Sequence, residues 1–139
     1  MEKVKQITNL LLSLRLLAHQ THLLSVSHAD HLLAERIEKD LDEDIDLLKE
    51  LYLYCFDDDT IASCSLTLES AFNFIKEVEP NASIDQCFSY ILDVIHKLVT
   101  LCAEAQGALN PDSSGLSTAL GDVARNLSQK GYLVKQRLK

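Results

Sequence analysis

The chain has 139 residues, of which 47% are apolar, with only four glycines and two prolines. This composition excludes a disordered chain and indicates a single domain, residues 1–139, with a modest core. The net charge of −8 argues against nucleic acid as a partner, because an acidic surface repels phosphates and attracts cations.

The cysteines and the opening residues indicate a cytoplasmic protein. The cysteines form no C-x-x-C pair and no zinc-finger spacing, so we expect reduced thiols, most of them buried and inert. The opening stretch lacks the cleavage site of a secretory signal. No apolar run reaches the roughly 18 residues of a spanning helix, so no membrane partner is expected. The four cysteines are Cys55, Cys64, Cys87 and Cys102.

Apolar residues at helical spacing predict two long helices in the first part of the chain. The first runs over about 3–24, and the second over about 29–54, with Ser27 or Asp30 as its N-cap. A shorter helix is predicted over about 61–78, capped by Asp59 or Thr60.

Two more long helices complete the predicted fold. Pro80 breaks the chain, Ser83 can cap a helix that ends near Ala108, and a last helix runs over about 116–138. Four long helices with a short one inserted midway describe an all-α four-helix bundle.

Side chains able to bind metal recur along the second predicted helix. At about 100° per residue, Glu35 lies about 40° from His31, Asp46 about 60° and Glu50 about 100°, so the four groups share one stripe. Imidazole and carboxylates are ligands for iron, manganese or zinc, and the harder oxygen ligands favour iron or manganese. The stripe therefore predicts a metal site.

The two halves of this stripe are too far apart for one metal centre. In a continuous helix the midpoints of the His31/Glu35 and Asp46/Glu50 pairs are separated by roughly 22 Å. A second copy of the chain, crossing antiparallel about a two-fold axis, can place each pair beside the other pair of its partner. A histidine from the end of the first helix can complete each site.

These residues resemble the motif of the Dps-type mini-ferritins, which are shells of ferritin-like subunits with ferroxidase centres at dimer interfaces. The motif has a histidine ending the first helix and another opening the second. A carboxylate follows four residues later, and then come an aspartate and a glutamate. Here these are His31, Glu35, Asp46 and Glu50, and the first histidine is either His19 or His22. The mid-sequence helix and the closing "LSQKGYLVKQRLK" also resemble the family.

The resemblance implies a ferritin-like bundle that oxidises Fe(II) with peroxide or O₂ and stores Fe(III) within a shell of about twelve subunits. Mn²⁺ or Zn²⁺ can substitute for iron at such sites. His31, Glu35, Asp46 and Glu50 would be the catalytic metal ligands. The chain departs from the family pattern in lacking the tryptophan after the first histidine and the glycine between the first two helices.

Other histidines and carboxylates are interpreted as bystanders. His28 and one of His19 and His22 need not bind metal, and Asp93 with His96 is expected to be a local helix pair. The remaining acids of the second helix are expected at the surface or lining a shell. They are Glu38, Asp40, Asp42, Glu43 and Asp44.

Two other functions remain as alternatives. One is a non-catalytic acidic helical interaction module, which would bind no iron stoichiometrically. The other is a ferritin-like oxidase or oxygenase with a site inside one subunit, which requires ligands from the last two helices that the sequence does not supply. Tight DNA binding is not expected, since the basic residues near the C-terminus fall mostly on the last predicted helix.

Overall fold

A computed structural model describes residues 1–139 as helices joined by short connections, which confirms the all-α prediction. The elements are α1 (Glu2–Leu24), α2 (His28–Glu38), α3 (Leu41–Cys55), the 3₁₀ helix η1 (Asp59–Ala62), α4 (Cys64–Ile75), α5 (Ile84–Ala108), the 3₁₀ helix η2 (Pro111–Ser113) and α6 (Ser114–Arg137).

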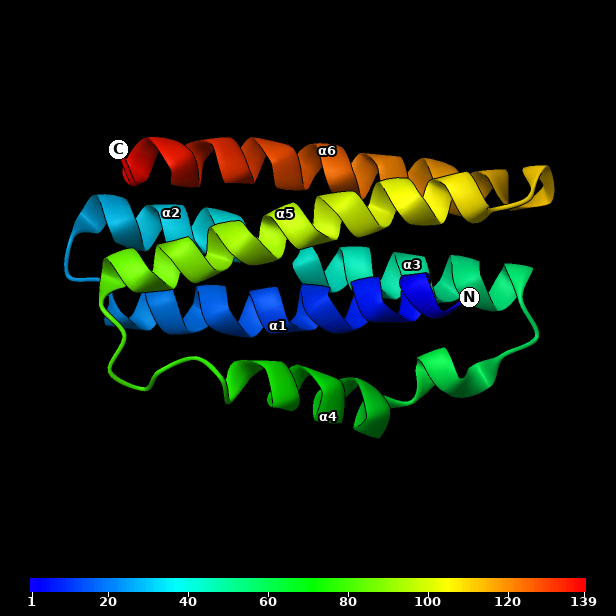
Figure 1. The fold of residues 1–139 in the computed structure, drawn as a ribbon, viewed down its shortest axis with the longest axis horizontal. Helices are drawn as coiled ribbons and strands as arrows, with labels where there is room; N and C mark the ends of the chain where they lie inside the picture. The colour runs from blue at the N-terminus through cyan, green and yellow to red at the C-terminus, as the bar shows by residue number, and fades with distance from the viewer.

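The long helices lie side by side around one apolar core (Figure 1). Helix α1 packs against α5 and against α2 and α3, which follow one another along the bundle, and α6 packs on α5 and α3. Helix α4 packs on the outer side of α1 and returns the chain to the start of α5. Leu11, Leu48, Tyr52, Phe88 and Leu98 are among the fully buried side chains.

The continuous second helix predicted over 29–54 is wrong, because the chain breaks between α2 and α3. Asp40 adopts a left-handed conformation with φ 67° and ψ 1°, and it is the one residue with positive φ. The angles and the 22 Å separation worked out for a straight helix therefore do not apply across the break.

Charge and a long-range contact explain why the helix breaks here. The break turns the acidic run into the first turn of α3, with Asp42, Glu43 and Asp44, where the helix dipole stabilises negative charge. The ammonium of Lys130 on α6 donates to the carbonyl oxygens of Ile37 at 2.9 Å and Lys39 at 2.8 Å. These bonds satisfy carbonyls that the end of α2 leaves without helical partners.

At position 40 a glycine variant should be more stable than an alanine variant, which is the reverse of the order within a helix. Asp40→Ala is expected to lower the free energy of unfolding by about 1 kcal/mol, whereas Asp40→Gly should cost less, since only glycine is unstrained at positive φ. Urea denaturation of both variants measures this order. At the exposed helical control position Glu43 the order should reverse, with glycine worse than alanine by about 0.5–1 kcal/mol. Equal ranking at the two positions would contradict the left-handed break.

The predicted helix over 61–78 is present in part but shorter and divided. Residues 59–62 form η1, and α4 ends at Ile75. The N-cap of α4 is Ser63, whose hydroxyl accepts from the amide of Leu66, rather than Asp59 or Thr60. Ser27 caps α2, and Ser83 forms a capping box with Gln86 at the start of α5, as predicted.

Arg137 ties the end of α6 to two other helices. Its guanidinium donates to both carboxylate oxygens of Asp30 on α2, at 2.6 and 3.1 Å, and reaches Asp85 on α5 at 2.9 Å. It also lies 5.4 Å from the ring centroid of Phe88. These hydrogen bonds raise the pKa of Arg137 further above its usual value. Asp30 is thus a buried partner of Arg137 and not the N-cap of α2.

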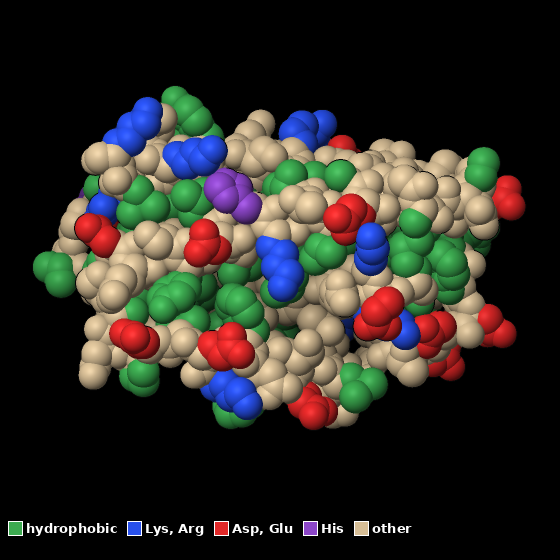
Figure 2. Space-filling model, in the orientation of Figure 1, with side chains coloured by type: hydrophobic (Ala, Val, Ile, Leu, Met, Phe, Trp, Pro, Cys, Tyr) green, Lys and Arg blue, Asp and Glu red, His purple; other side chains and the backbone are tan.

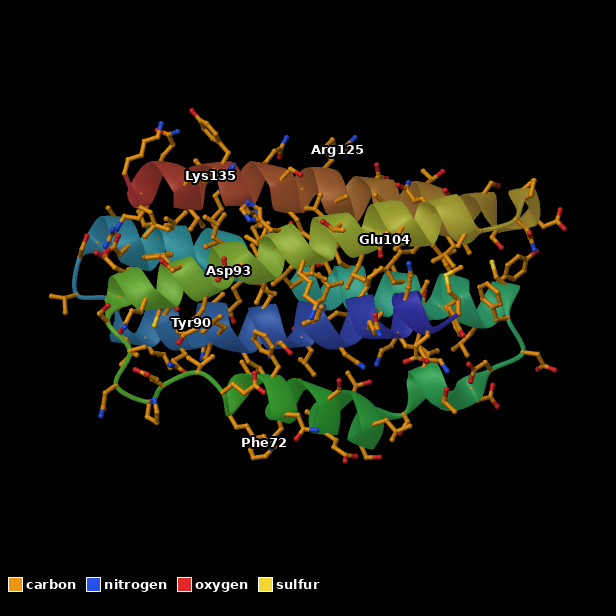
Figure 3. All side chains as sticks on the ribbon, viewed as in Figure 1. Phe72, Tyr90, Asp93, Glu104, Arg125 and Lys135 are labelled. Atoms are coloured by element: carbon orange, nitrogen blue, oxygen red, sulfur yellow. The ribbon has the colours of Figure 1, made fainter.

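The surface mixes charged and apolar groups. Acidic and basic side chains are interspersed with apolar ones on the face shown in Figure 2. Phe72 projects from the outer side of α4 and is 64% exposed (Figure 3). No helix combines the length and the apolar character that crossing a bilayer requires. All four cysteines are free, and two of them, Cys87 and Cys102, are buried, whereas Cys64 is exposed.

Candidate metal centre

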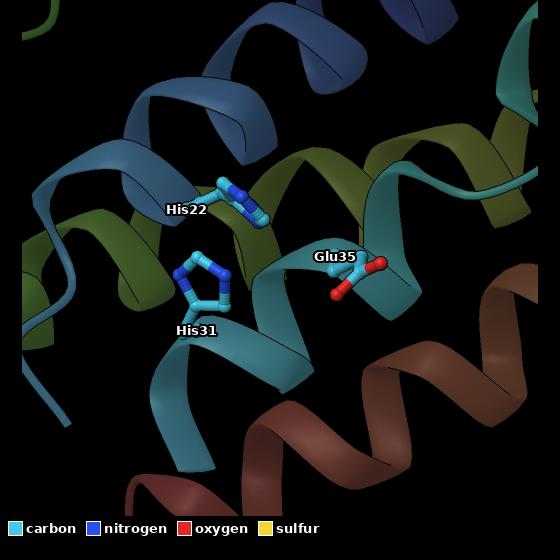
Figure 4. Close-up of side chains that lie close together, drawn as sticks. All are labelled: His22, His31 and Glu35. Carbon is cyan, nitrogen blue, oxygen red and sulfur yellow. The ribbon is translucent and has the colours of Figure 1, made fainter. Parts of the chain in front are cut away.

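Three of the predicted ligands come together in one place. His22, His31 and Glu35 each offer a ligand atom, and these atoms all lie within 4.8 Å of one another (Figure 4). The ring centroids of His22 and His31 are 3.8 Å apart, and the two ring planes are tilted by 39°. We call these residues the three-residue cluster.

Local structure positions this cluster. Residues 25–27 reverse the chain between α1 and α2, so the last turn of α1 lies against the first turns of α2. Ser27 caps α2, and its carbonyl accepts from the amide of His31. His31 and Glu35 are four residues apart and therefore lie on the same helix face, opposite His22.

The donor set suits a divalent transition metal. Two imidazole nitrogens and a carboxylate are a usual ligand combination for iron, manganese or zinc. The Nδ1 atom of His22 is buried and has no hydrogen-bond partner, which is unusual for a buried polar atom. A metal ion bound by the cluster would give this nitrogen a partner. Three ligands leave other coordination positions to be filled from elsewhere.

The structure distinguishes the two candidates for the first histidine. His22 belongs to the three-residue cluster, whereas His19, one turn earlier on α1, has its Nδ1 3.1 Å from Oε1 and 3.3 Å from Oε2 of Glu38. His28 is exposed at the start of α2. Glu38, which the sequence analysis interpreted as a surface or shell-lining acid, is the partner of His19. Its spacing of seven residues from His31 places the two on the same face of α2, and this spacing could have identified it.

Asp46 and Glu50 lie outside the three-residue cluster, on α3 beyond the break, and both are exposed. Neighbours on α3 show which way they face. Asp42, four residues before Asp46, pairs with Arg15 of α1 at 2.9 Å, and Lys49 donates to Thr67 of α4. The side of α3 that carries Asp46 therefore flanks α1, as do His31 and Glu35 on α2.

A polar groove of about 970 Å³ lies where α2, α3 and α6 meet, and Glu35, Glu38, Asp40 and Asp44 are among its lining residues. Burial raises the pKa of Asp44, although the positive charge of Lys130 opposes this shift. Burial lowers the pKa of Lys130, against the attraction of Asp44 and Asp40.

Asp93 and His96 on α5 are both exposed and belong to no cluster of possible metal ligands. No hydrogen bond or ion pair joins them, so their interpretation as a local helix pair stays a prediction. Comparison of the chain with family models, curated proteins and solved structures gave no match.

Proposed function

We propose that this chain is a mini-ferritin of the Dps type, folded as a ferritin-like four-helix bundle with a short helix between its second and third long helices. It oxidises Fe(II) with hydrogen peroxide or O₂ at centres shared between subunits. It then stores Fe(III) in a hollow oligomeric shell of about twelve subunits and so limits oxidative damage in the cytoplasm.

One observation supports this proposal: the three-residue cluster brings together about half of the ligands that the proposed ferroxidase centre needs. Two histidines and one carboxylate converge there, and the Nδ1 of His22 is buried without a partner. Two carboxylates, Asp46 and Glu50, remain exposed on the part of α3 that flanks α1. In a two-fold dimer, Asp46 and Glu50 of each chain can complete the three-residue cluster of the other chain.

Exposed leucines beside the ligands support contact with a second copy. Leu16 and Leu23 lie on one face of α1, separated by two helical turns, and are 37% and 68% exposed. Leu53 of α3, seven residues after Asp46, is 39% exposed. Burial of such side chains at a dimer interface would contribute roughly 25 cal/mol per Å² of apolar area.

The proposed chemistry assigns a role to each ligand. Two Fe(II) ions are the substrate, and one H₂O₂ with two protons accepts two electrons to give two Fe(III) ions and two waters. His22 and His31 bind Fe(II) as neutral donors. The anionic oxygens of Glu35, Asp46 and Glu50 favour Fe(III) over Fe(II) and so assist electron loss. Further carboxylates lining the proposed shell would receive the oxidised ion.

Anaerobic Fe(II) titration followed by one equivalent of peroxide tests the proposal, together with a mass measurement of the assembly in solution. We expect stoichiometric Fe(II) binding, rapid formation of Fe(III) absorbance and an oligomer built from dimers. A monomer with full ferroxidase activity would contradict it in favour of a site within one subunit. Absence of stoichiometric iron binding would favour an acidic interaction module.

A further inference from the structure

We propose that His19 and Glu38 form a second divalent-cation position, next to the three-residue cluster but distinct from it. The position is built from residues of one chain, so its existence does not depend on a dimer. Its role, loading Fe(II) ahead of oxidation, rests on the proposed function.

The geometry of the pair suits a shared cation. The Nδ1 atom of His19 lies almost equally far from the two carboxylate oxygens of Glu38, at 3.1 and 3.3 Å. A cation replacing the proton between these groups would gain an imidazole nitrogen and up to two carboxylate oxygens. The His19 side chain is 53% exposed and that of Glu38 25%, so water can complete the coordination shell.

The pair extends a row of metal-capable side chains that begins with the three-residue cluster, and we call this row the ladder. His19 and His22 are one turn apart on α1, with rings only 5° from parallel and centroids 6.1 Å apart. On α2, His31, Glu35 and Glu38 follow at spacings of four and three residues and therefore share a face. Glu35 of the three-residue cluster and Glu38 of the pair are therefore neighbours along α2.

The carboxylate of this position belongs to an acidic groove. Glu35 and Glu38 both line the groove of about 970 Å³ at the α2–α3 break, together with Asp40 and Asp44. Four carboxylates along one groove attract divalent cations, although Arg36, Lys39 and Lys130 also line it and offset part of the charge. Glu38 is thus shared between the groove and the pair with His19.

The competing account is a simple ion pair between His19 and Glu38. Such an exposed pair contributes at most about 1 kcal/mol to stability and needs no metal. The two accounts predict different cation binding. If the pair is a cation site, removing either side chain should remove a bound cation, whereas removing a simple ion pair should leave cation binding unchanged.

Anaerobic titration of the full chain with Zn²⁺ by calorimetry, and with Co²⁺ by visible absorption, separates these accounts. We expect two classes of cation site in the wild-type protein. His19→Ala and Glu38→Gln should each weaken one class at least about tenfold and leave the other. His28→Ala and His96→Ala are matched controls, since both histidines are exposed and outside the ladder. If the His19→Ala and Glu38→Gln variants both bind these cations as the wild-type protein does, the proposal is overturned.

Two further measurements keep the result interpretable. In the Asp46→Asn/Glu50→Gln double variant the shared centre is lost, but the His19/Glu38 position should still bind Zn²⁺, so failure of the proposed function and failure of this site are distinguishable. In the wild-type protein, nitrogen NMR of the histidine rings should show Zn²⁺ shifting the Nδ1 resonance of His19. An unmoved His19 resonance at saturating Zn²⁺ would refute the site without any substitution.

Discussion

Glu50→Gln and His31→Ala chains, each nearly inactive alone, are expected to recover about a quarter of the wild-type ferroxidase rate when unfolded and refolded together in equal amounts. Each variant alone should lose at least about tenfold in initial rate of Fe(II) oxidation, because each removes a proposed metal ligand from every centre. The rate is measured from Fe(III) absorbance after peroxide addition.

The expected quarter follows from the proposed two-fold arrangement of two chains. Random pairing makes about half of the dimers heterodimers. In each heterodimer one centre combines His31 of one chain with Glu50 of the other and is intact, whereas the second centre carries both substitutions. A centre contained within one chain would give no recovery, since every chain then carries a defect.

Two controls belong to the same experiment. Co-refolding Glu50→Gln chains with Asp46→Asn chains should recover no ferroxidase activity. In the proposed dimer every chain then lends a defective Asp46/Glu50 pair to its partner, so no centre is intact. Mixing the two folded proteins without denaturant should recover little if the dimers do not exchange. Recovery in the Glu50/Asp46 mixture equal to that of the Glu50/His31 mixture would contradict the assignment of ligands to opposite subunits.

Arg137→Ala is expected to lower the free energy of unfolding by about 2–3 kcal/mol, the largest effect on stability that we expect from a single charged residue. The substitution removes two hydrogen bonds to Asp30, whose side chain is only 12% exposed, and leaves this carboxylate without its cation. It also removes the guanidinium beside Phe88. Urea denaturation measures the loss.

A matched control and a double variant test the cause. Arg125→Ala removes an exposed pair with Asp122 on the same helix, with side chains 67% and 55% exposed, and should cost less than about 0.5 kcal/mol. Adding Asp30→Asn to Arg137→Ala should restore part of the stability, because the unpaired buried charge is removed. A loss for Arg125→Ala equal to that for Arg137→Ala would contradict a special role of the Arg137–Asp30 pair, because Arg125 has only an exposed partner.

Local sequence features predicted most of the helices. Apolar spacing located α1, α5 and α6 to within a few residues, and the caps Ser27 and Ser83 act where their side chains indicated. The His31/Glu35 pair could be predicted because a four-residue spacing on one helix brings two side chains together, whatever surrounds them. The same spacing identified Asp46 and Glu50 as a pair.

Long-range contacts explain what the sequence missed. At the break beside Asp40, Lys130 donates to the carbonyl of Ile37, which lies 93 residues earlier in the chain and which a continuous helix would have used. The partner of Asp30 is Arg137, 107 residues away. Neither contact leaves a periodic pattern, because each depends on how α6 packs across α2 and α3.

The amino-acid sequence by itself determined an acidic, all-helical chain with histidines and carboxylates at helical spacing, since hydrophobic periodicity and short-range geometry depend only on neighbouring residues. Only the tertiary structure decided that His22 and not His19 joins His31 and Glu35, and that His19 pairs with Glu38 instead. The physical reason is that the relative translation of two packed helices sets which turns meet. That translation depends on the turn at 25–27 and on core packing, which the spacing along either helix does not specify.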